Sequence, residues 1–175
     1  MKSIELERTF LAKFLPPDLK NCQHKEIVDI YIPKSDRHPS LRIRKNGERF
    51  EITKKFPVET SASMQNENTI KLTEEEFLSL SKISGKVVRK IRYFYKYDKF
   101  IAEIDVFQDA LWGLVIIDFE FDSKSDQNSF QMPDFCLVDV TDEEFIAGGM
   151  LCGKSYSDIE DNLRKFDYKK IDVIL

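Results

Sequence analysis

Polar and apolar residues alternate along the stretch Ile4–Leu11, IELERTFL, around which the other strands of the chain are arranged. Such alternation is typical of a β-strand with one polar and one apolar face, since side chains two residues apart point the same way. Glu5, Glu7 and Thr9 then share the polar face. Two carboxylates so close together repel each other unless a cation lies between them. The strand is therefore a candidate metal site, although a solvated strand face is the commoner reason for such a pair.

The same spacing of two like charges, with an apolar residue between them, recurs along the chain. The further doublets are Arg42/Arg44, Lys90/Arg92, Glu103/Asp105 and Asp118/Glu120. Strands that carry them have two options in an antiparallel sheet: the charges face water on an open sheet, or they line the interior of a closed barrel. Basic strands beside acidic ones suit a metal–polyphosphate ligand, because basic groups hold phosphates and carboxylates hold the metal.

The composition bounds the class of protein. The chain has 175 residues, 42% hydrophobic and 33% charged, which favours one folded domain over residues 1–175. The net charge of −4 argues against a nucleic-acid partner. The three cysteines have no metal-ligand spacing and suggest no disulfide framework. No apolar run approaches the roughly 20 residues that span a bilayer, so we expect a cytoplasmic protein with no membrane partner.

Eight strands and a few helices are predicted, which gives an antiparallel α+β fold. Asn46-Gly47 is a strong hairpin signal, and the Ser-rich Val58–Asn66 is expected to be a loop. Capping boxes at Thr73 and Thr141 predict helix starts, with Gly148-Gly149 ending the second helix. Ser155–Phe166 has the spacing of a final amphipathic helix. The expected strands are 4–11, 25–32, 41–45, 49–55, 67–72, 86–97, 100–107 and 115–121.

The order of these motifs resembles that of the CYTH domain, or triphosphate tunnel metalloenzyme, family. The resemblance runs from Ile4 to about Leu151, and together the motifs are specific although no single one is. The matching motifs are Glu5-Leu6-Glu7, Leu41-Arg42-Ile43-Arg44, Thr53-Lys54-Lys55, Lys90-Ile91-Arg92-Tyr93, Glu103-Ile104-Asp105 and Asp118-Phe119-Glu120. The chain departs from the family where Thr9 replaces a lysine, and where Gln65–Thr69 replaces an Arg-x-Glu-x-Glu strand.

The resemblance implies a closed eight-stranded antiparallel β-barrel, the triphosphate tunnel, with helices packed on the outside. Its strands would cover about residues 3–122, and a helical segment about residues 123–175. It also implies a divalent cation, Mg²⁺ or Mn²⁺, held by Glu5, Glu7, Asp118 and Glu120. The triphosphate would be bound by Arg42, Arg44, Lys55, Lys90 and Arg92. Glu103 or Asp105 would orient the attacking water or assist a second metal, although an ion pair with a tunnel arginine is an equal alternative for Glu103.

Three functions follow from this resemblance. The first is metal-dependent hydrolysis of inorganic tripolyphosphate or of a triphosphorylated organic molecule. The second is a class IV adenylate cyclase, which makes cyclic AMP and pyrophosphate from ATP. The third is a non-catalytic protein that binds polyphosphate or nucleotide, which the loss of the lysine at Thr9 motivates.

Overall fold

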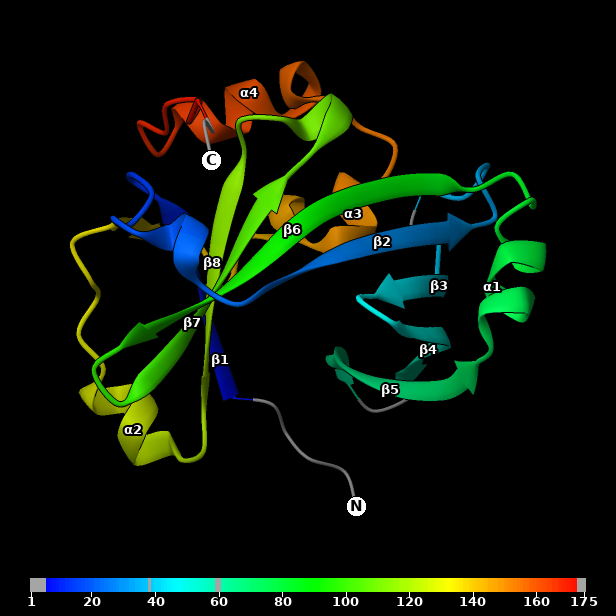
Figure 1. Cartoon of the computed structure of the whole chain (residues 1–175), viewed down its shortest axis with the longest axis horizontal. Helices are drawn as coiled ribbons and strands as arrows, with labels where there is room; N and C mark the ends of the chain where they lie inside the picture. The colour runs from blue at the N-terminus through cyan, green and yellow to red at the C-terminus, as the bar shows by residue number, and fades with distance from the viewer. Residues whose placement is uncertain (1–5, 38, 59–60, 173–175) are drawn as a thin grey trace.

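The structure is a computed structural model that describes residues 6–37, 39–58 and 61–172, with the backbone alone for 55–58 and 61–67. In this part the chain forms a nine-stranded antiparallel sheet of order β5-β4-β3-β2-β6-β7-β8-β1-β9 (Figure 1). Its strands are β1 (Leu6–Ala12), β2 (His24–Ile32), β3 (Leu41–Asn46), β4 (Arg49–Val58), β5 (Ser61–Leu72), β6 (Lys86–Tyr97), β7 (Phe100–Phe107), β8 (Val115–Phe121) and β9 (Cys136–Asp139). The α-helices are α1 (Glu74–Leu80), α2 (Lys124–Ser129), α3 (Gly148–Leu151) and α4 (Tyr156–Arg164), and short 3₁₀ turns are η1 (Leu19–Asn21), η2 (Asp109–Leu111) and η3 (Glu144–Ile146). The α+β class is confirmed.

The expected closed eight-stranded barrel is not confirmed. Within the described residues, β5 and β9 stand at opposite ends of the strand order and do not pair with each other. The ninth strand is part of the reason, because β9 pairs with β1 at Phe10, Leu11 and Ala12 and so occupies an edge that a closing strand would need. The sheet still curls strongly, with β3, β4 and β5 turned back below β2 (Figure 1).

Two local predictions were wrong. The described part of the expected loop Val58–Asn66 is strand: β4 continues to Val58 and β5 begins at Ser61, because main-chain hydrogen bonds in a hairpin do not depend on apolar side chains. Thr141 does not cap a helix, because its hydroxyl donates to Asp139 Oδ1 (2.5 Å) and accepts from Thr9 N (3.0 Å). Helix α3 begins at Gly148, where the sequence predicts a helix end.

One face of the sheet is apolar and packs into the main core. Phe10, Ile104, Ile117 and Phe119 are fully buried there, and the ring of Phe130, which follows α2, lies 4.6 Å from that of Phe119. Alternate residues of these strands point into the core, so their neighbours must point to the opposite face. The apolar core thus fixes which side chains reach the candidate site.

The C-terminal helices cover one end of the opposite face. Ile116 of β8 is buried there against Leu151 of α3 and against Ile159 and Leu163 of α4. The predicted helix over Ser155–Phe166 is confirmed as α4, with Ile159 and Leu163 fully buried. Within the part of the chain that the structure describes, every helix is too short or too polar to cross a bilayer.

The capping box of α1 is confirmed and provides a test of the local fold. Thr73 Oγ1 accepts from Glu76 N (3.2 Å), and Glu76 Oε2 accepts from Thr73 N (2.7 Å). We expect Thr73→Ala to lower the free energy of unfolding by about 1 kcal/mol in urea denaturation. Ser79→Ala, which removes a hydroxyl without a hydrogen bond from the same helix, is the control and should change it by less than about 0.5 kcal/mol. Equal stability of the two variants would contradict the capping role.

Candidate functional site

The charged doublets that the structure describes lie on one face of the sheet. Residues directly opposite each other on neighbouring strands point to the same side. Thr9 is opposite Asp118, and Glu7 is opposite Glu120. Arg92 is likewise opposite Asp105. The remaining cross-strand pairs extend this set across the sheet: Glu103 with Asp118, Lys25 with Arg92, Asp29 with Arg44, and Tyr31 with Arg42. We call this surface the polar face.

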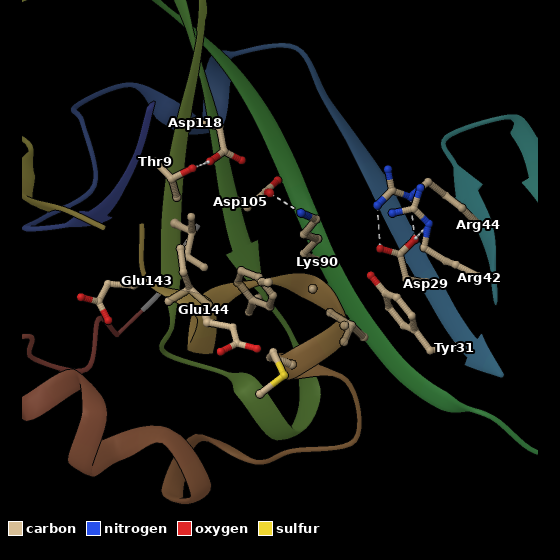
Figure 2. Close-up of a pocket in the computed structure, with 18 of the residues that line it drawn as sticks. Thr9, Asp29, Tyr31, Arg42, Arg44, Lys90, Asp105, Asp118, Glu143 and Glu144 are labelled. Atoms are coloured by element: carbon tan, nitrogen blue, oxygen red, sulfur yellow. Dashed lines mark hydrogen bonds and ion pairs between the residues drawn. The ribbon is translucent and has the colours of Figure 1, made fainter. Parts of the chain in front are cut away.

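A cavity of about 460 Å³ opens on the polar face, between the sheet and the segment 141–150, which contains η3 and most of α3. Figure 2 shows Asp29, Arg42 and Arg44 on one wall, with Thr9, Asp105 and Asp118 on the other. Six of the predicted site residues line the cavity: Glu7, Arg42, Arg44, Lys90, Asp105 and Asp118. Two others, Glu103 and Glu120, line a separate hollow with Lys99, Asp122 and Asp126. Glu5 and the side chain of Lys55 lie outside the described residues.

Arg92 is the centre of the acidic wall. Its guanidinium donates to both oxygens of Asp105 at 2.7 Å, forms an ion pair with Glu103, and lies 3.5 Å from Asp118 Oδ2. Lys90 forms a second ion pair with Asp105. The alternative that Glu103 pairs with a tunnel arginine is therefore confirmed. Arg92 connects the cavity to the hollow beyond it, because its three acidic partners are distributed between the two.

The carboxylates of this wall have opposite pKa shifts. Burial and the negative charges of Asp105 and Glu7 raise the pKa of Asp118 to about 7. Burial alone would raise the pKa of Asp105 too, but Lys90 and Arg92 outweigh it and hold that pKa below its ordinary value. Burial raises the pKa of Glu103 despite its pair with Arg92. The wall therefore holds one firmly ionised carboxylate beside two that take up protons more readily.

These shifts predict how stability depends on pH in EDTA. Between the ordinary pKa of 3.8 and the folded value of about 7, native Asp118 holds a proton that the unfolded chain has released. Raising the pH through this window therefore destabilises the native state, by at most about 1.4 kcal/mol per pH unit. Urea denaturation at pH 5.5 and 7.5 should show lower stability at pH 7.5. The difference should shrink in Asp118→Asn, with Glu103 contributing a residual of the same sign, and an equal difference in both proteins would refute the assignment.

The basic wall is built on β2 and β3. Arg44 donates to both oxygens of Asp29, at 2.6 and 2.7 Å, so its paired donors are already used. Arg42 Nε lies 4.0 Å from Asp29 Oδ1, and it is buried without a hydrogen-bond partner. An unpaired buried donor is costly, and a ligand oxygen in the cavity would relieve that cost. Arg42 is thus the arginine of this wall that is best prepared to receive an anion.

Some cavity residues were not predicted as site residues. Asp29 and Tyr31 belong to β2, where their spacing of two gave a usable signal that they share a face. Glu143 and Glu144 lie at the plug, by which we mean the segment 141–150, and both line the cavity. The pattern Thr141-Asp142-Glu143-Glu144 is that of a capping box, which predicts a helix start there and not a cavity wall. Lys25 lies directly opposite Arg92 on the neighbouring strand. Burial, and after it the positive charge of Arg92, lowers the pKa of Lys25.

Thr9 connects the acidic wall to the plug. Its hydroxyl donates to Asp118 Oδ1 at 2.8 Å, and its main-chain N–H donates to Thr141 Oγ1 at 3.0 Å. Thr9 is nearly buried, with 7% of its surface exposed. A neutral hydroxyl therefore contacts Asp118 where the family pattern has a lysine.

The acidic side chains of the cavity offer part of a ligand set for a divalent cation. Among the described residues, no three or more acidic, histidine or cysteine side chains gather closely enough to form a metal site. Glu7 and Asp118 do line one cavity, and the charge of Glu7 contributes to the raised pKa of Asp118. Carboxylate oxygens are the ligands that Mg²⁺ and Mn²⁺ prefer, and a cation would relieve this repulsion. The two side chains therefore fit a divalent cation as part of its ligand set.

The protein is therefore of a class in which one curled antiparallel sheet carries a basic wall and an acidic wall on opposite sides of a single cavity. The chain belongs to the CYTH domain family, whose model matches residues 3–130. This confirms the resemblance inferred from the motifs.

Solved structures share the fold. The inorganic triphosphatase NE1496 superposes with a TM-score of 0.66 at 24% identity, over 87% of this chain and 97% of that one. A candidate adenylate cyclase from Bacillus halodurans gives a TM-score of 0.50 at 16% identity, over 99% of this chain and 95% of that one. The search of curated proteins returned no match.

Proposed function

We propose that this protein hydrolyses a triphosphate in a reaction that depends on a divalent cation. The observation that carries the proposal is the cavity itself, which is lined by Arg42, whose Nε has no hydrogen-bond partner, and by Glu7 and Asp118. A donor without a partner suits an anionic oxygen, and carboxylates that repel each other suit a cation. A triphosphate with a bound metal ion supplies both the anionic oxygens and the cation. The likeness to an inorganic triphosphatase, which is one of fold, agrees with this proposal.

The basic residues have distinct parts in binding. Arg42 and Lys90 contact phosphate oxygens directly, and Arg44, held by Asp29, contributes positive charge to the same wall. Arg92 contributes charge from behind Asp105 and Glu103. Lys55 is assigned to the triphosphate from the family motif alone.

The acidic residues hold the cation and move the proton. Glu5, Glu7, Asp118 and Glu120 would hold Mg²⁺ or Mn²⁺, which when bound neutralises negative charge on the phosphate oxygens. Water attacks the terminal phosphorus in line, the bond from that phosphorus to the bridging oxygen breaks, and the remaining phosphates leave as the second product. Asp105, which lines the cavity, orients the attacking water and takes its proton. Glu103 lines the neighbouring hollow and acts through its ion pair with Arg92, which also holds Asp105.

A binding protein without catalysis is the second candidate. The observation in its favour is Thr9, whose hydroxyl contacts Asp118 in place of a charged lysine. Each charge-assisted contact is worth about 1.5–3 kcal/mol, so the missing lysine would cost about 10- to 150-fold in binding or rate.

Phosphate release from tripolyphosphate, ATP and thiamine triphosphate, with Mg²⁺, with Mn²⁺ and in EDTA, tests these functions. We expect cation-dependent release, and we expect Glu5→Gln/Glu7→Gln to lose it. Stabilisation of the fold by tripolyphosphate with no release from any substrate would favour the binding protein. Cyclic AMP and pyrophosphate from ATP would select the cyclase instead.

A further inference from the structure

Tyr31 is a buried cavity residue for which the proposed reaction has no role so far. It lies on β2, directly opposite Arg42 of β3, and only 5% of its surface is exposed. Because residues directly opposite each other on neighbouring strands share a face, its phenol lies beside the Arg42 side chain on the polar face. Figure 2 shows the ring beside Asp29 and Arg42, on the wall opposite Asp118. The phenol therefore lies beside the arginine of the basic wall whose Nε has no hydrogen-bond partner.

The plug closes onto the same phenol. A Cβ atom added to Gly148 would lie 2.6 Å from Tyr31 Oη, and one added to Gly149 would lie 3.8 Å from Tyr31 Cε1. Only the first distance is too short for any real contact. Gly148 does not have a left-handed φ, so its backbone would accept another residue and the phenol alone excludes a side chain. Gly148 is thus required for space.

We propose that Tyr31 is a positioning residue: it holds the Arg42 guanidinium toward the cavity for an oxygen of the triphosphate, and Gly148 is required because the phenol takes the space of a side chain there. This inference rests on the proposed function only in taking triphosphate as the ligand. Tyr31 lies on β2 of the basic wall and Gly148 lies in the plug. Their close approach at Tyr31 Oη therefore links the plug to the basic wall. The plug thereby becomes part of anion recognition.

Tyr31→Phe removes that oxygen and keeps the ring in the core. We expect KM for tripolyphosphate to rise about 3- to 12-fold, as for the loss of one polar neighbour that orients Arg42, while kcat changes less than about threefold. The rise in melting temperature that tripolyphosphate causes should shrink to match. Tyr95→Phe is the matched control, since Tyr95 packs on the apolar face of the sheet. It should leave both quantities unchanged.

A double-mutant cycle tests the link between Tyr31 and Gly148. Gly148→Ala should weaken tripolyphosphate binding by a similar factor when Tyr31 is present. In the Tyr31→Phe background the nearest atom is Cζ, at 3.7 Å, an ordinary contact, so Gly148→Ala should add no further loss. Effects that multiply in the double variant, or a Tyr31→Phe protein with unchanged KM and unchanged ligand stabilisation, would overturn the inference.

The readouts separate this inference from the proposed function. If no phosphate is released but Tyr31→Phe still weakens stabilisation by tripolyphosphate, the positioning role stands and hydrolysis is rejected. If phosphate is released and Tyr31→Phe behaves like Tyr95→Phe, hydrolysis stands and the positioning role is rejected. If tripolyphosphate neither stabilises the protein nor is cleaved, both are rejected.

Discussion

Arg92→Met is expected to lower the free energy of unfolding by about 3–5 kcal/mol at pH 8, because it removes the cation beside Glu103 and Asp118 and leaves buried Asp105 with Lys90 alone. Arg92 holds Asp105 through two hydrogen bonds, pairs with Glu103 and lies 3.5 Å from Asp118. Methionine keeps much of the volume of the side chain but none of its charge or donors. Urea denaturation measures the loss.

The loss should also depend on pH. At pH 5.5 the carboxylates left behind can take up protons, so the destabilisation should be smaller than at pH 8. Lys96→Met, on the same strand at an exposed position, is the control and should change stability by less than about 0.5 kcal/mol. If Arg92→Met were as stable as Lys96→Met, the acidic wall would not depend on Arg92.

Asp118→Asn is expected to make the metal-free protein more stable and a poorer catalyst. Burial and the charges of Asp105 and Glu7 oppose ionisation of Asp118, so a neutral amide removes an unfavourable charge at pH 7.5. The amide oxygen still accepts from Thr9, which preserves local geometry. Loss of one charged ligand should reduce phosphate release about 10- to 150-fold. A gain in stability with a loss of rate is the signature of a residue retained for function.

Asp161→Asn is the matched control for this variant. Asp161 lies on α4, with 94% of its side chain exposed. It should alter neither phosphate release nor stability by more than a small amount. An Asp118→Asn protein that lost both stability and activity would show instead that Asp118 supports the fold.

The sequence predicted the polar face well because side-chain direction along a strand is a local property. A residue and its neighbour two positions on share a face whatever the strand pairs with. The doublets Arg42/Arg44 and Lys90/Arg92 therefore lie on the expected face, and cross-strand register brings Arg92 opposite Asp105. The order of the motifs also identified the family correctly.

The ion pairs could not be predicted, since they depend on which strands are neighbours. Arg44 meets Asp29 because β2 and β3 pair, and Arg92 meets Asp105 because β6 and β7 do. Strand β9, Cys136–Asp139, was missed because it is only four residues long. Its pairing with β1 is part of why the expected barrel closure is not confirmed. Glu143 and Glu144 of the plug were not predicted as site residues either, because the position of the plug depends on the pairing of β9, the strand before it.

We propose that the two walls of one cavity act together on a triphosphate. The most direct test measures phosphate release from inorganic tripolyphosphate with Mg²⁺, for the wild type, Arg42→Gln and Asp118→Asn side by side. We predict cation-dependent release by the wild type, a raised KM in Arg42→Gln, and a reduced kcat with greater metal-free stability in Asp118→Asn. Release that neither variant reduces would place the reaction elsewhere and contradict the claim.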